Sequence, residues 1–529
     1  MANVIVNNGR LMLTPMNRDS YFYSQFGCLD TRGRYGGISM RIKANRGVSF
    51  AVTVAWTDTC GSNELKSFTR TTAQLNWVFD GQERLYWFPF SVFTGVDTTK
   101  LDMIYLSQFT NSVVIGPMAF FCGSTGTEYV PPTLTLPTKP RETVPAPSSN
   151  AKPFVIDTFA NQDTNALGEW HGGDEGMTVT YGRNMITLRT NDSDLSWNTQ
   201  LTSQCFDMTP YTGAYLHIAY SGSNKFSVAM QQHNSNCDDK IAPYPETWDS
   251  LEAARYATTT DIYIPISHFH IEHKRSIGFN LRGFYTQEAT QISKIEIVSS
   301  VPRGFTIPSK LPSGKLVFAC KRPNSFAFAI DDGDPKYAQR VMDLIKKENI
   351  PVTFFTVGLP LLVESTNLSA VYKDMAARGH QIALHSYTHP KMEGLPDIQS
   401  IDWEYNNDIG AVKQVFGDAG HSNYFRPPFG TEGARMRQRL VETLGDENAH
   451  LVGWSIDIED WIWAESDTPE KQLDAYKRDL AKGGNLLVMH YLYESTVELL
   501  PEFIRLAKAS GKTLMRVDQC MEDPNAPPL

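Results

Sequence analysis

The chain has 529 residues, of which 41% are hydrophobic and 20% are charged, and its formal net charge is −10 at pH 7. This charge gives no indication of a basic surface, which argues against nucleic acid and anionic membranes as partners. No stretch reaches the run of about 18 apolar residues that a bilayer-spanning helix needs. A chain of this length predicts about three domains.

The first part of the chain contains an internal duplication. The segment Phe88–Phe93 matches Ile264–Phe269, which lies 176 residues further on. Both copies consist of short alternating apolar and polar runs separated by turn residues, a pattern typical of antiparallel sheets with one buried face. We therefore predict two β-sandwich domains at residues 1–122 and 153–301, the first without the leading strands of the second.

A segment rich in Pro, Thr and Ser separates the two predicted sandwiches. It covers residues 123–152 and cannot supply a hydrophobic core. Such a composition is typical of an extended linker.

Six of the seven cysteines form three predicted disulfides, which indicate an oxidising compartment. The predicted pairs are Cys28–Cys60, Cys205–Cys237 and Cys320–Cys520. Buried free thiols of a cytosolic protein are the alternative, and the pairing state of Cys122 stays open. Glycosylation sequons at Asn191 and Asn367 are compatible with secretion. We expect a secreted or cell-wall protein whose signal peptide is absent from this chain.

From Lys315 the pattern changes to alternating strands and helices. Apolar runs predict strands at Phe326–Ile330, Val352–Val357, Ile382–Leu384, Leu451–Ser455 and Asn485–Met489. Amphipathic runs predict helices at Tyr337–Glu348, Ala370–Arg378, Asn407–Phe416, Ala434–Leu444, Pro469–Ala481 and Thr496–Ala509. This alternation over residues 315–525 predicts a parallel sheet or barrel with its chemistry at the carboxyl ends of the strands.

Carboxylates and imidazoles follow these predicted strands. Asp331 and Asp332 follow the first strand, and His385 and His389 follow the third. If a helical turn opens at His385, residues i and i+4 share a face and both rings converge on one point. Two neutral imidazoles with one carboxylate are the ligand set of a catalytic zinc site. A core position is the alternative for His385 alone, and its pairing with His389 favours the ligand role.

Five segments in this order resemble the motifs of the polysaccharide deacetylase family (NodB homology, carbohydrate esterase family 4), which includes chitin and peptidoglycan deacetylases. They are Asp331-Asp332-Gly333, His385-Ser386-Tyr387-Thr388-His389-Pro390, Arg426-Pro427-Pro428-Phe429, Asp457-Ile458-Glu459-Asp460-Trp461 and Val488-Met489-His490. The resemblance covers roughly Lys315 to Cys520. It implies a distorted (β/α) barrel and one divalent metal ion, with zinc expected and cobalt, nickel or manganese as alternatives.

The resemblance also implies roles for individual side chains. Asp332, His385 and His389 are expected to hold the metal, which would polarise an acetamide carbonyl and acidify water. Asp331 is the expected general base, and Arg426 is expected to orient it.

Further residues complete the implied catalytic set. His490 is the expected general acid, with Asp460 orienting its ring and raising its pKa. The main-chain N–H of Phe429 is expected to stabilise the oxyanion, and Phe429 and Trp461 are expected to contact substrate. Tyr491 stands where an Asp is common in the family, which leaves open how the acid is tuned.

Three interpretations compete with these roles. Asp460 is alternatively a partner of Arg426, and Asp457 is either a helix cap or a site residue. Tryptophans of the two sandwiches either fill their cores or stack on sugar rings; these are Trp56, Trp77, Trp87, Trp170, Trp197 and Trp248.

The predicted function is metal-dependent removal of N-acetyl groups from an extracellular aminosugar polymer, with chitin or its oligomers as the expected substrate. Peptidoglycan, other aminosugar polymers and acetylxylan are alternative substrates. A catalytically silent carbohydrate-binding wall protein is the alternative from another class, although it has no reason to keep every ligand, base and acid candidate. We expect a monomer whose partner is the polysaccharide, with no nucleic acid and no membrane.

Overall fold

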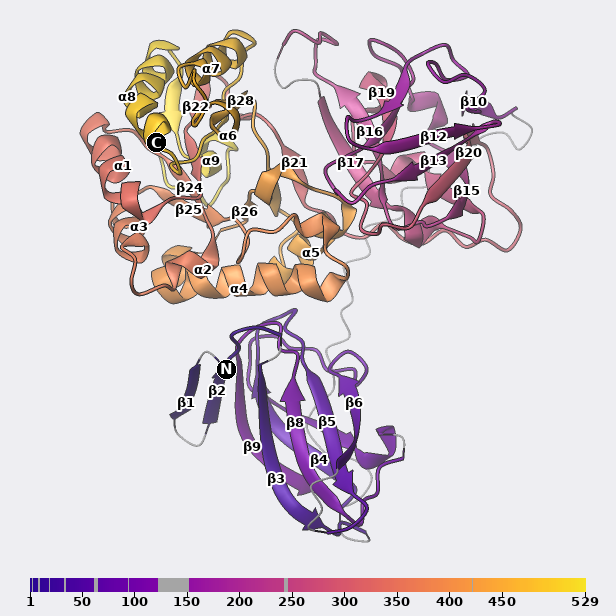
Figure 1. Cartoon of the computed structure of the whole chain (residues 1–529), viewed down its shortest axis with the longest axis vertical. Coiled ribbons are helices and arrows are strands. Elements are labelled where there is room, and N and C mark those ends of the chain that lie inside the picture. The colour runs from indigo at the N-terminus through magenta and orange to yellow at the C-terminus, as the bar shows by residue number, and fades with distance from the viewer. Residues whose placement is uncertain are drawn as a thin grey trace. The chain divides into compact units, whose positions relative to one another are not determined.

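The computed structural model describes residues 1, 3–7, 10–18, 20–32, 35–60, 65–93, 95–121, 152–241, 246–420 and 422–529. Cys122 and the predicted linker, except for its last residue, lie outside these ranges. The chain divides into two compact units, the first built on the segment up to Arg141 and the second on most of the rest (Figure 1). None of the helices among the described residues is both long and apolar enough to cross a membrane.

The first unit consists of two antiparallel sheets around one apolar core. The strand orders are β1-β2-β9-β4-β7 and β3-β8-β5-β6. Their bounds are β1 Asn3–Asn7, β2 Arg10–Thr14, β3 Tyr21–Leu29, β4 Gly37–Lys43, β5 Ala51–Thr57, β6 Leu65–Thr71, β7 Arg84–Pro89, β8 Leu101–Ser107 and β9 Val113–Phe121. Met40 of one sheet and Val54 of the other belong to the shared core, as expected when each sheet buries one face.

The second unit begins with a similar pair of sheets. Their orders are β12-β13-β20-β15-β18, with β10 paired to β20, and β11-β14-β19-β16-β17. The bounds are β10 Phe154–Asp157, β11 His171–Gly173, β12 Thr178–Gly182, β13 Met185–Arg189, β14 Trp197–Gln200, β15 Tyr215–Gly222, β16 Ser227–His233, β17 Glu246–Glu252, β18 Asp261–Pro265, β19 Ser276–Arg282 and β20 Thr290–Val298. Buried side chains of both sheets, Trp197 and Ile295 among them, form one core.

The two sandwiches share a strand order. The path β2-β9-β4-β7 corresponds to β13-β20-β15-β18, and β3-β8-β5-β6 corresponds to β14-β19-β16-β17. Within the described part of residues 1–121, no strand corresponds to β10 or β11. Disulfides join Cys28 to Cys60 in the first sandwich and Cys205 to Cys237 in the second.

The remainder of the second unit is an open half barrel of six parallel strands in the order β21-β27-β26-β25-β24-β23. These strands are β21 Lys315–Val317, β23 Ala329–Asp331, β24 Thr353–Thr356, β25 Gln381–Leu384, β26 Tyr424–Phe425 and β27 His450–Val452. Two small parallel pairs join β22 Ser325–Ala327 to β30 Thr513–Met515 and β28 Ile456–Asp457 to β29 Leu487–Val488. Strand β24 is buried along its whole length, as is typical of parallel sheets covered on both faces.

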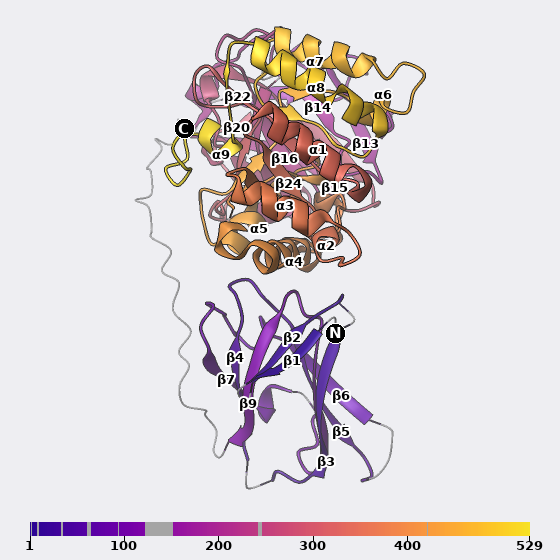
Figure 2. The same cartoon turned by 90° about the vertical axis from the view of Figure 1, so that its left-hand side faces the viewer.

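Helices cover the half barrel, with α1, α3 and α8 side by side in Figure 2. The bounds are α1 Pro335–Glu348, α2 Gly358–Leu361, α3 Leu368–Ala377, α4 Ile398–Phe416, α5 Ala434–Leu444, α6 Asp460–Trp463, α7 Lys471–Ala481, α8 Glu494–Ala509 and α9 Val517–Cys520. Asp334 caps α1 by accepting a hydrogen bond from Lys336 N. The disulfide Cys320–Cys520 joins positions 200 residues apart in the sequence and ties both ends of this domain together.

Several bounds differ from the prediction, and two differences change the architecture. The single strand predicted at Phe326–Ile330 is interrupted at Phe328, so that β22 and β23 pair with different strands. The sheet therefore does not close into a full barrel. Helix α4 begins at Ile398, nine residues before the predicted start at Asn407, because Asp397 caps it by accepting from Ser400 N.

Candidate active site

The half barrel brings the predicted site residues to one edge of its sheet. Asp331 ends β23, His385 follows β25 and Arg426 follows β26. His490 lies two residues beyond β29 and forms a parallel bridge with Asp331. Residues that are 159 positions apart along the chain therefore meet at the carboxyl ends of the strands.

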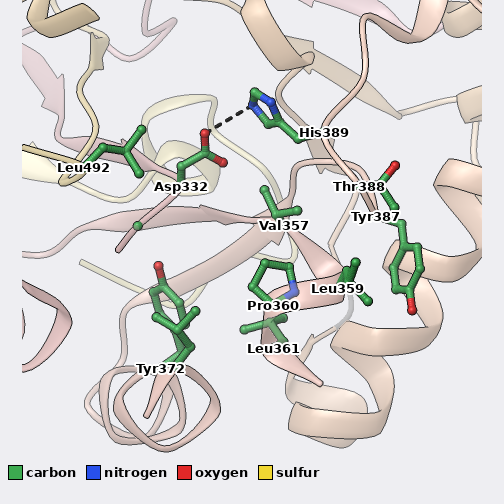
Figure 3. A pocket seen from close by; sticks show the side chains of 12 residues that line it. Asp332, Val357, Leu359, Pro360, Leu361, Tyr372, Tyr387, Thr388, His389 and Leu492 are labelled. Atoms are coloured by element: carbon green, nitrogen blue, oxygen red, sulfur yellow. Dashed lines mark ion pairs between the residues drawn. The ribbon is translucent and has the colours of Figure 1, made fainter. Parts of the chain in front are cut away.

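Asp332, His385 and His389 form a compact cluster of candidate metal ligands. One ligand atom of each lies within 4.8 Å of the others. His389 Nε2 is 3.2 Å from Asp332 Oδ2, and His385 Nε2 is 3.6 Å from Asp332 Oδ1. Figure 3 shows the Asp332 carboxylate facing the His389 ring. Asp332 Oδ1 is buried and has no hydrogen-bond partner among the described residues, which fits a carboxylate oxygen that receives a cation.

The prediction of a helical turn at these histidines is wrong. The chain from His385 to His389 is a loop with φ of 71° at Ser386 and 65° at His389. These left-handed residues bring the ring centroids of the two histidines to 5.0 Å.

Glu404 of α4 holds this loop, and sequence reasoning missed it. Its buried carboxylate accepts hydrogen bonds from Tyr387 N at 2.9 Å and from Thr388 N at 2.8 Å. The Thr388 hydroxyl donates to the same carboxylate. An acidic residue between Trp403 and Tyr405, just before the helix predicted at Asn407–Phe416, was the signal that could have found it.

His385 is oriented and kept neutral by its surroundings. Its Nδ1 lies 2.6 Å from the carbonyl oxygen of Arg426, a contact that directs Nε2 toward Asp332. Burial lowers the pKa of His385 to about 3, although the Asp332 carboxylate opposes this. A neutral imidazole is the form that ligates a metal.

Asp331 and Arg426 form a buried ion pair beside the cluster. Arg426 Nη1 donates to Asp331 Oδ1 at 2.6 Å, and the guanidinium also donates to the carbonyl oxygens of Val452, Gly453 and Leu487, each at 3.2 Å. Burial raises the pKa of Asp331, and the Arg426 charge opposes this rise. Asp331 is thus a fixed carboxylate with increased basicity.

Asp460 is the partner of His490. Its two oxygens bind His490 Nδ1 at 2.9 Å and His490 N at 2.7 Å. The alternative pairing of Asp460 with Arg426 is wrong, because the Arg426 guanidinium is taken up by Asp331 and three carbonyls. Burial lowers the pKa of His490, but the charge and hydrogen bond of Asp460 outweigh it and raise that pKa to about 9.

Asp457 lines the cavity and does not cap α6. The cap position belongs to Glu459, whose φ is 54°. Asp457 Oδ1 accepts from Glu459 N at 2.7 Å, and burial raises the pKa of Asp457 to about 6.

One cavity of about 450 Å³ is lined by Asp331, Asp332, His385, His389, Asp457 and His490. Phe429 and Trp461 stand on its wall with 60% and 65% of their surface exposed, and the Phe429 ring lies edge-on to His389 with centroids 4.8 Å apart. Phe429 has a φ of 60°, which is rare for an aromatic residue and typical of functional sites. A smaller hollow of about 280 Å³ also borders Asp332 and His389 and has Leu359 and Leu361 in its wall (Figure 3).

Tyr491 is buried, and its hydroxyl meets that of Tyr372. The two hydroxyl oxygens are 2.5 Å apart, and the Tyr491 ring covers Gly333, where a Cβ would lie 1.8 Å from the ring.

Among the sandwich tryptophans, Trp56, Trp77 and Trp197 are core residues, whereas Trp170 is 48% exposed.

Comparisons with known proteins agree on this domain. The family model described as polysaccharide deacetylase matches residues 319–445. A chitin deacetylase of Pestalotiopsis sp is 30% identical over 219 residues, which are 41% of this chain and 70% of that protein. The peptidoglycan-N-acetylglucosamine deacetylase PgdA of Listeria monocytogenes is 26% identical, over 43% of this chain and 45% of its own length.

A solved chitin deacetylase from Colletotrichum lindemuthianum aligns with 41% of this chain and 95% of its own, at 21% identity and a TM-score of 0.36. The residues that the family model matches lie in the half barrel, and the sequence likeness to the Pestalotiopsis protein extends over more than two thirds of that relative. With the ordered motifs and their convergence on one cavity, this likeness places the chain in the polysaccharide deacetylase family.

Proposed function

We propose that the protein is a metal-dependent hydrolase that removes N-acetyl groups from an extracellular aminosugar polymer, with chitin or chitooligosaccharides as substrate. The observation that carries this proposal is the convergence of Asp332, His385 and His389 on the cavity that also holds Asp331 and His490. The named activity of the Pestalotiopsis relative supports it.

The candidate ligand cluster fits a divalent metal ion. Two imidazoles and one carboxylate suit zinc, with cobalt, nickel or manganese as alternatives. When bound, such an ion supplies Lewis acidity toward the acetamide carbonyl and toward water.

The remaining residues handle the protons. Asp331 accepts the proton of the attacking water, and Arg426 keeps its carboxylate in place. His490 is protonated at neutral pH because of Asp460, and it donates its proton to the departing amine. The main-chain N–H of Phe429 stabilises the oxyanion.

The exposed rings of Phe429 and Trp461 contact the substrate, because their flat apolar surfaces suit the faces of sugar rings. The likeness to PgdA keeps peptidoglycan as an alternative substrate. Other aminosugar polymers and acetylxylan also stay as alternatives.

We further propose that the first 301 residues are two copies of one domain, with boundaries at 1–122 and 153–301 around a linker at 123–152, followed by a catalytic domain at 315–525. The common strand order and the equally spaced disulfides support the duplication. Secretion or a cell-wall location, with the polysaccharide as partner of a monomer, completes the proposal.

Acetate release from a panel of acetylated glycans tests this function. Chitin oligomers with added zinc are expected to release acetate, and chelator or the Asp331→Asn substitution is expected to abolish release. Release that survives both controls would contradict the metal and the base. The absence of release from every glycan of the panel would favour a binding protein.

A further inference from the structure

The catalytic cavity is not built by the half barrel alone. Asp194, which lies in the segment between β13 and β14 of the second sandwich, is part of its wall. Lys391, two residues after His389, lines the cavity beside it. A side chain from the sandwich therefore reaches the chamber in which the reaction takes place.

Lys391 connects the two domains at this wall. Its Nζ lies 2.5 Å from Asp194 Oδ2 and 2.7 Å from Asp192 Oδ1. The Thr431 hydroxyl also donates to Asp194. All three charged side chains remain about one third exposed, at 33% for Lys391, 37% for Asp192 and 31% for Asp194. Each of the four carboxylate oxygens already meets Lys391 or Thr431, and a carboxylate oxygen has a further lone pair that can accept from a ligand hydroxyl.

A second cavity of about 390 Å³ lies directly beyond this cluster. It shares Lys391 with the catalytic cavity, and the sandwich supplies Asn191, Asp192, Thr286 and Gln287 to its wall. Its volume falls within the usual range of about 300–1,000 Å³ for ligand sites. Apolar surface is added to this wall by Phe284, Tyr285, Leu395 and Pro396. Polar groups beside aromatic and aliphatic surface suit a sugar chain, which presents both hydroxyl groups and apolar ring faces.

A buried polar network joins the sandwich to the half barrel. Arg437 of α5 donates to Glu432 at 2.5 Å and to Asp249 of β17 at 3.2 Å. Glu432 accepts from the Trp248 indole, and Ala434 N donates to Ser227 Oγ at 3.0 Å. Glu432, Arg437 and Asp249 are 1%, 2% and 5% exposed, and buried charges of this kind require their partners on both sides.

We propose that the 190–196 segment of the second sandwich and Lys391 form a binding site for the sugar units that flank the acetylated unit in the catalytic cavity. A single aminosugar chain then extends from Asp331 and His490 across the Lys391 cluster into the second cavity. The ligand is a neutral N-acetylated oligosaccharide, and this site rests on the proposed function. The sandwich thus contributes to selecting long chains over short ones.

Chain-length dependence tests the site. The protein is produced without N-glycans, because Asn191 begins a sequon and lines the second cavity. The measured quantity is kcat/KM for the chitin hexamer divided by kcat/KM for the dimer. It is compared in the parent, in Asp194→Ala and in Gln287→Ala. The control is Asp163→Asn, an exposed position of the same sandwich. Loss of one or two hydrogen bonds to the longer chain predicts a fall of about tenfold in this ratio for the first two variants. The control is expected to keep the parental ratio.

Gln287 has no ion pair to lose and is exposed, so its variant remains informative if Asp194→Ala unfolds. A ratio that stays parental in folded Asp194→Ala and Gln287→Ala overturns the site while leaving the proposed function intact.

A binding measurement in a variant without the proposed base tests the site independently of the reaction. In the full chain carrying Asp331→Asn, calorimetry with zinc present measures the affinity for the hexamer. Addition of Asp194→Ala is expected to weaken that affinity about tenfold. If the parent releases no acetate from any oligomer, the proposed function fails, and an affinity that Asp194→Ala leaves unchanged overturns the site as well.

Discussion

Burial lowers the pKa of His490, but carboxylates raise it, Asp460 above all and then Asp331 and Asp332. Asp460 meets both the ring nitrogen and the main-chain N–H of His490, so the proposed acid and its main counter-charge form one unit. Without the Asp460 carboxylate the pKa of His490 would fall, because burial disfavours the charged form and only the smaller contributions of Asp331 and Asp332 would oppose it. The contact therefore decides the pH range in which the amine can be protonated.

The first prediction concerns the alkaline limit of activity. Since the pKa of His490 is raised to about 9, kcat of the parent should be level around pH 8 and fall as the pH rises through about 9. Asp460→Asn removes the charge that raises this pKa, so the fall should begin at lower pH. At pH 8 the loss in kcat is about tenfold for each unit by which the pKa drops below 8. Acetate release measured as a function of pH gives both curves.

The exposed Asp467, between α6 and α7, offers the matched control. Asp467→Asn should keep the parental profile. An Asp460→Asn profile that keeps the parental alkaline limit would exclude His490 as the acid set by Asp460.

Residue types and order were sufficient to predict the candidate ligands, but backbone conformation was not. The spacing of His385 and His389 suggested a helical turn, whereas left-handed residues in a loop bring the rings together. Asp332 and Phe429 also have positive φ, at 43° and 60°. Such conformations cost on the order of 1–3 kcal/mol each and persist only where surrounding contacts impose them, which a local sequence pattern does not reveal.

At the scale of elements, helix α4 acts on the site through Glu404. The helix places this carboxylate under the loop that carries His389, and there it accepts two main-chain N–H groups. Removal of the carboxylate would leave buried donors without partners and loosen the loop.

The second prediction follows from this contact. Glu404→Ala should weaken zinc binding by about tenfold or more, as is usual when a partner that orients ligands is lost. Competition with a chromophoric chelator measures this affinity without any substrate. Glu498→Ala, on the exposed face of α8, should bind zinc like the parent. Equal affinity in Glu404→Ala would show that the loop holds its shape without α4.

The helices of the half barrel were predicted more closely than its strands. Helix α5 has the predicted bounds, because its apolar face repeats with a clear helical period. The strand predicted at Phe326–Ile330 is two strands in two sheets, since a continuous buried apolar run carries no mark of where pairing changes. Glu404 was missed for a related reason: its role depends on a loop that lies elsewhere in the sequence.

At the scale of the whole molecule, the disulfides close loops of very different length. Cys320–Cys520 closes a loop of 200 residues, whereas Cys205–Cys237 closes one of 32. A longer closed loop removes more entropy from the unfolded chain.

The third prediction compares these two bridges. Replacement of Cys320 and Cys520 by Ser should lower the free energy of unfolding of the half barrel by about 2–5 kcal/mol. The same change at Cys205 and Cys237 should cost the second sandwich about 1–2 kcal/mol less. Urea unfolding without reductant measures both losses. A larger loss at the shorter loop would contradict the entropic argument.

The duplication is a prediction from equal spacings in the sequence, and the common strand order of the two sandwiches supports it. The sequence did not reveal the contact of the second sandwich with the catalytic cavity, because that contact depends on how two folded domains pack. Asp194 lies in a turn-rich stretch with no catalytic motif nearby. Its place beside Lys391 follows from the packing of the sandwich on the half barrel, to which contacts of β17 with α5 and with β21 contribute.

The buried network between β17 and α5 also bears on how such enzymes evolve. A half barrel inherited without its sandwich would leave Glu432 and Arg437 without the Trp248 and Asp249 partners that they meet across the junction. Gene rearrangement that separated the two would thus be selected against until those charges had been replaced. In this lineage the half barrel and the second sandwich are expected to be inherited together.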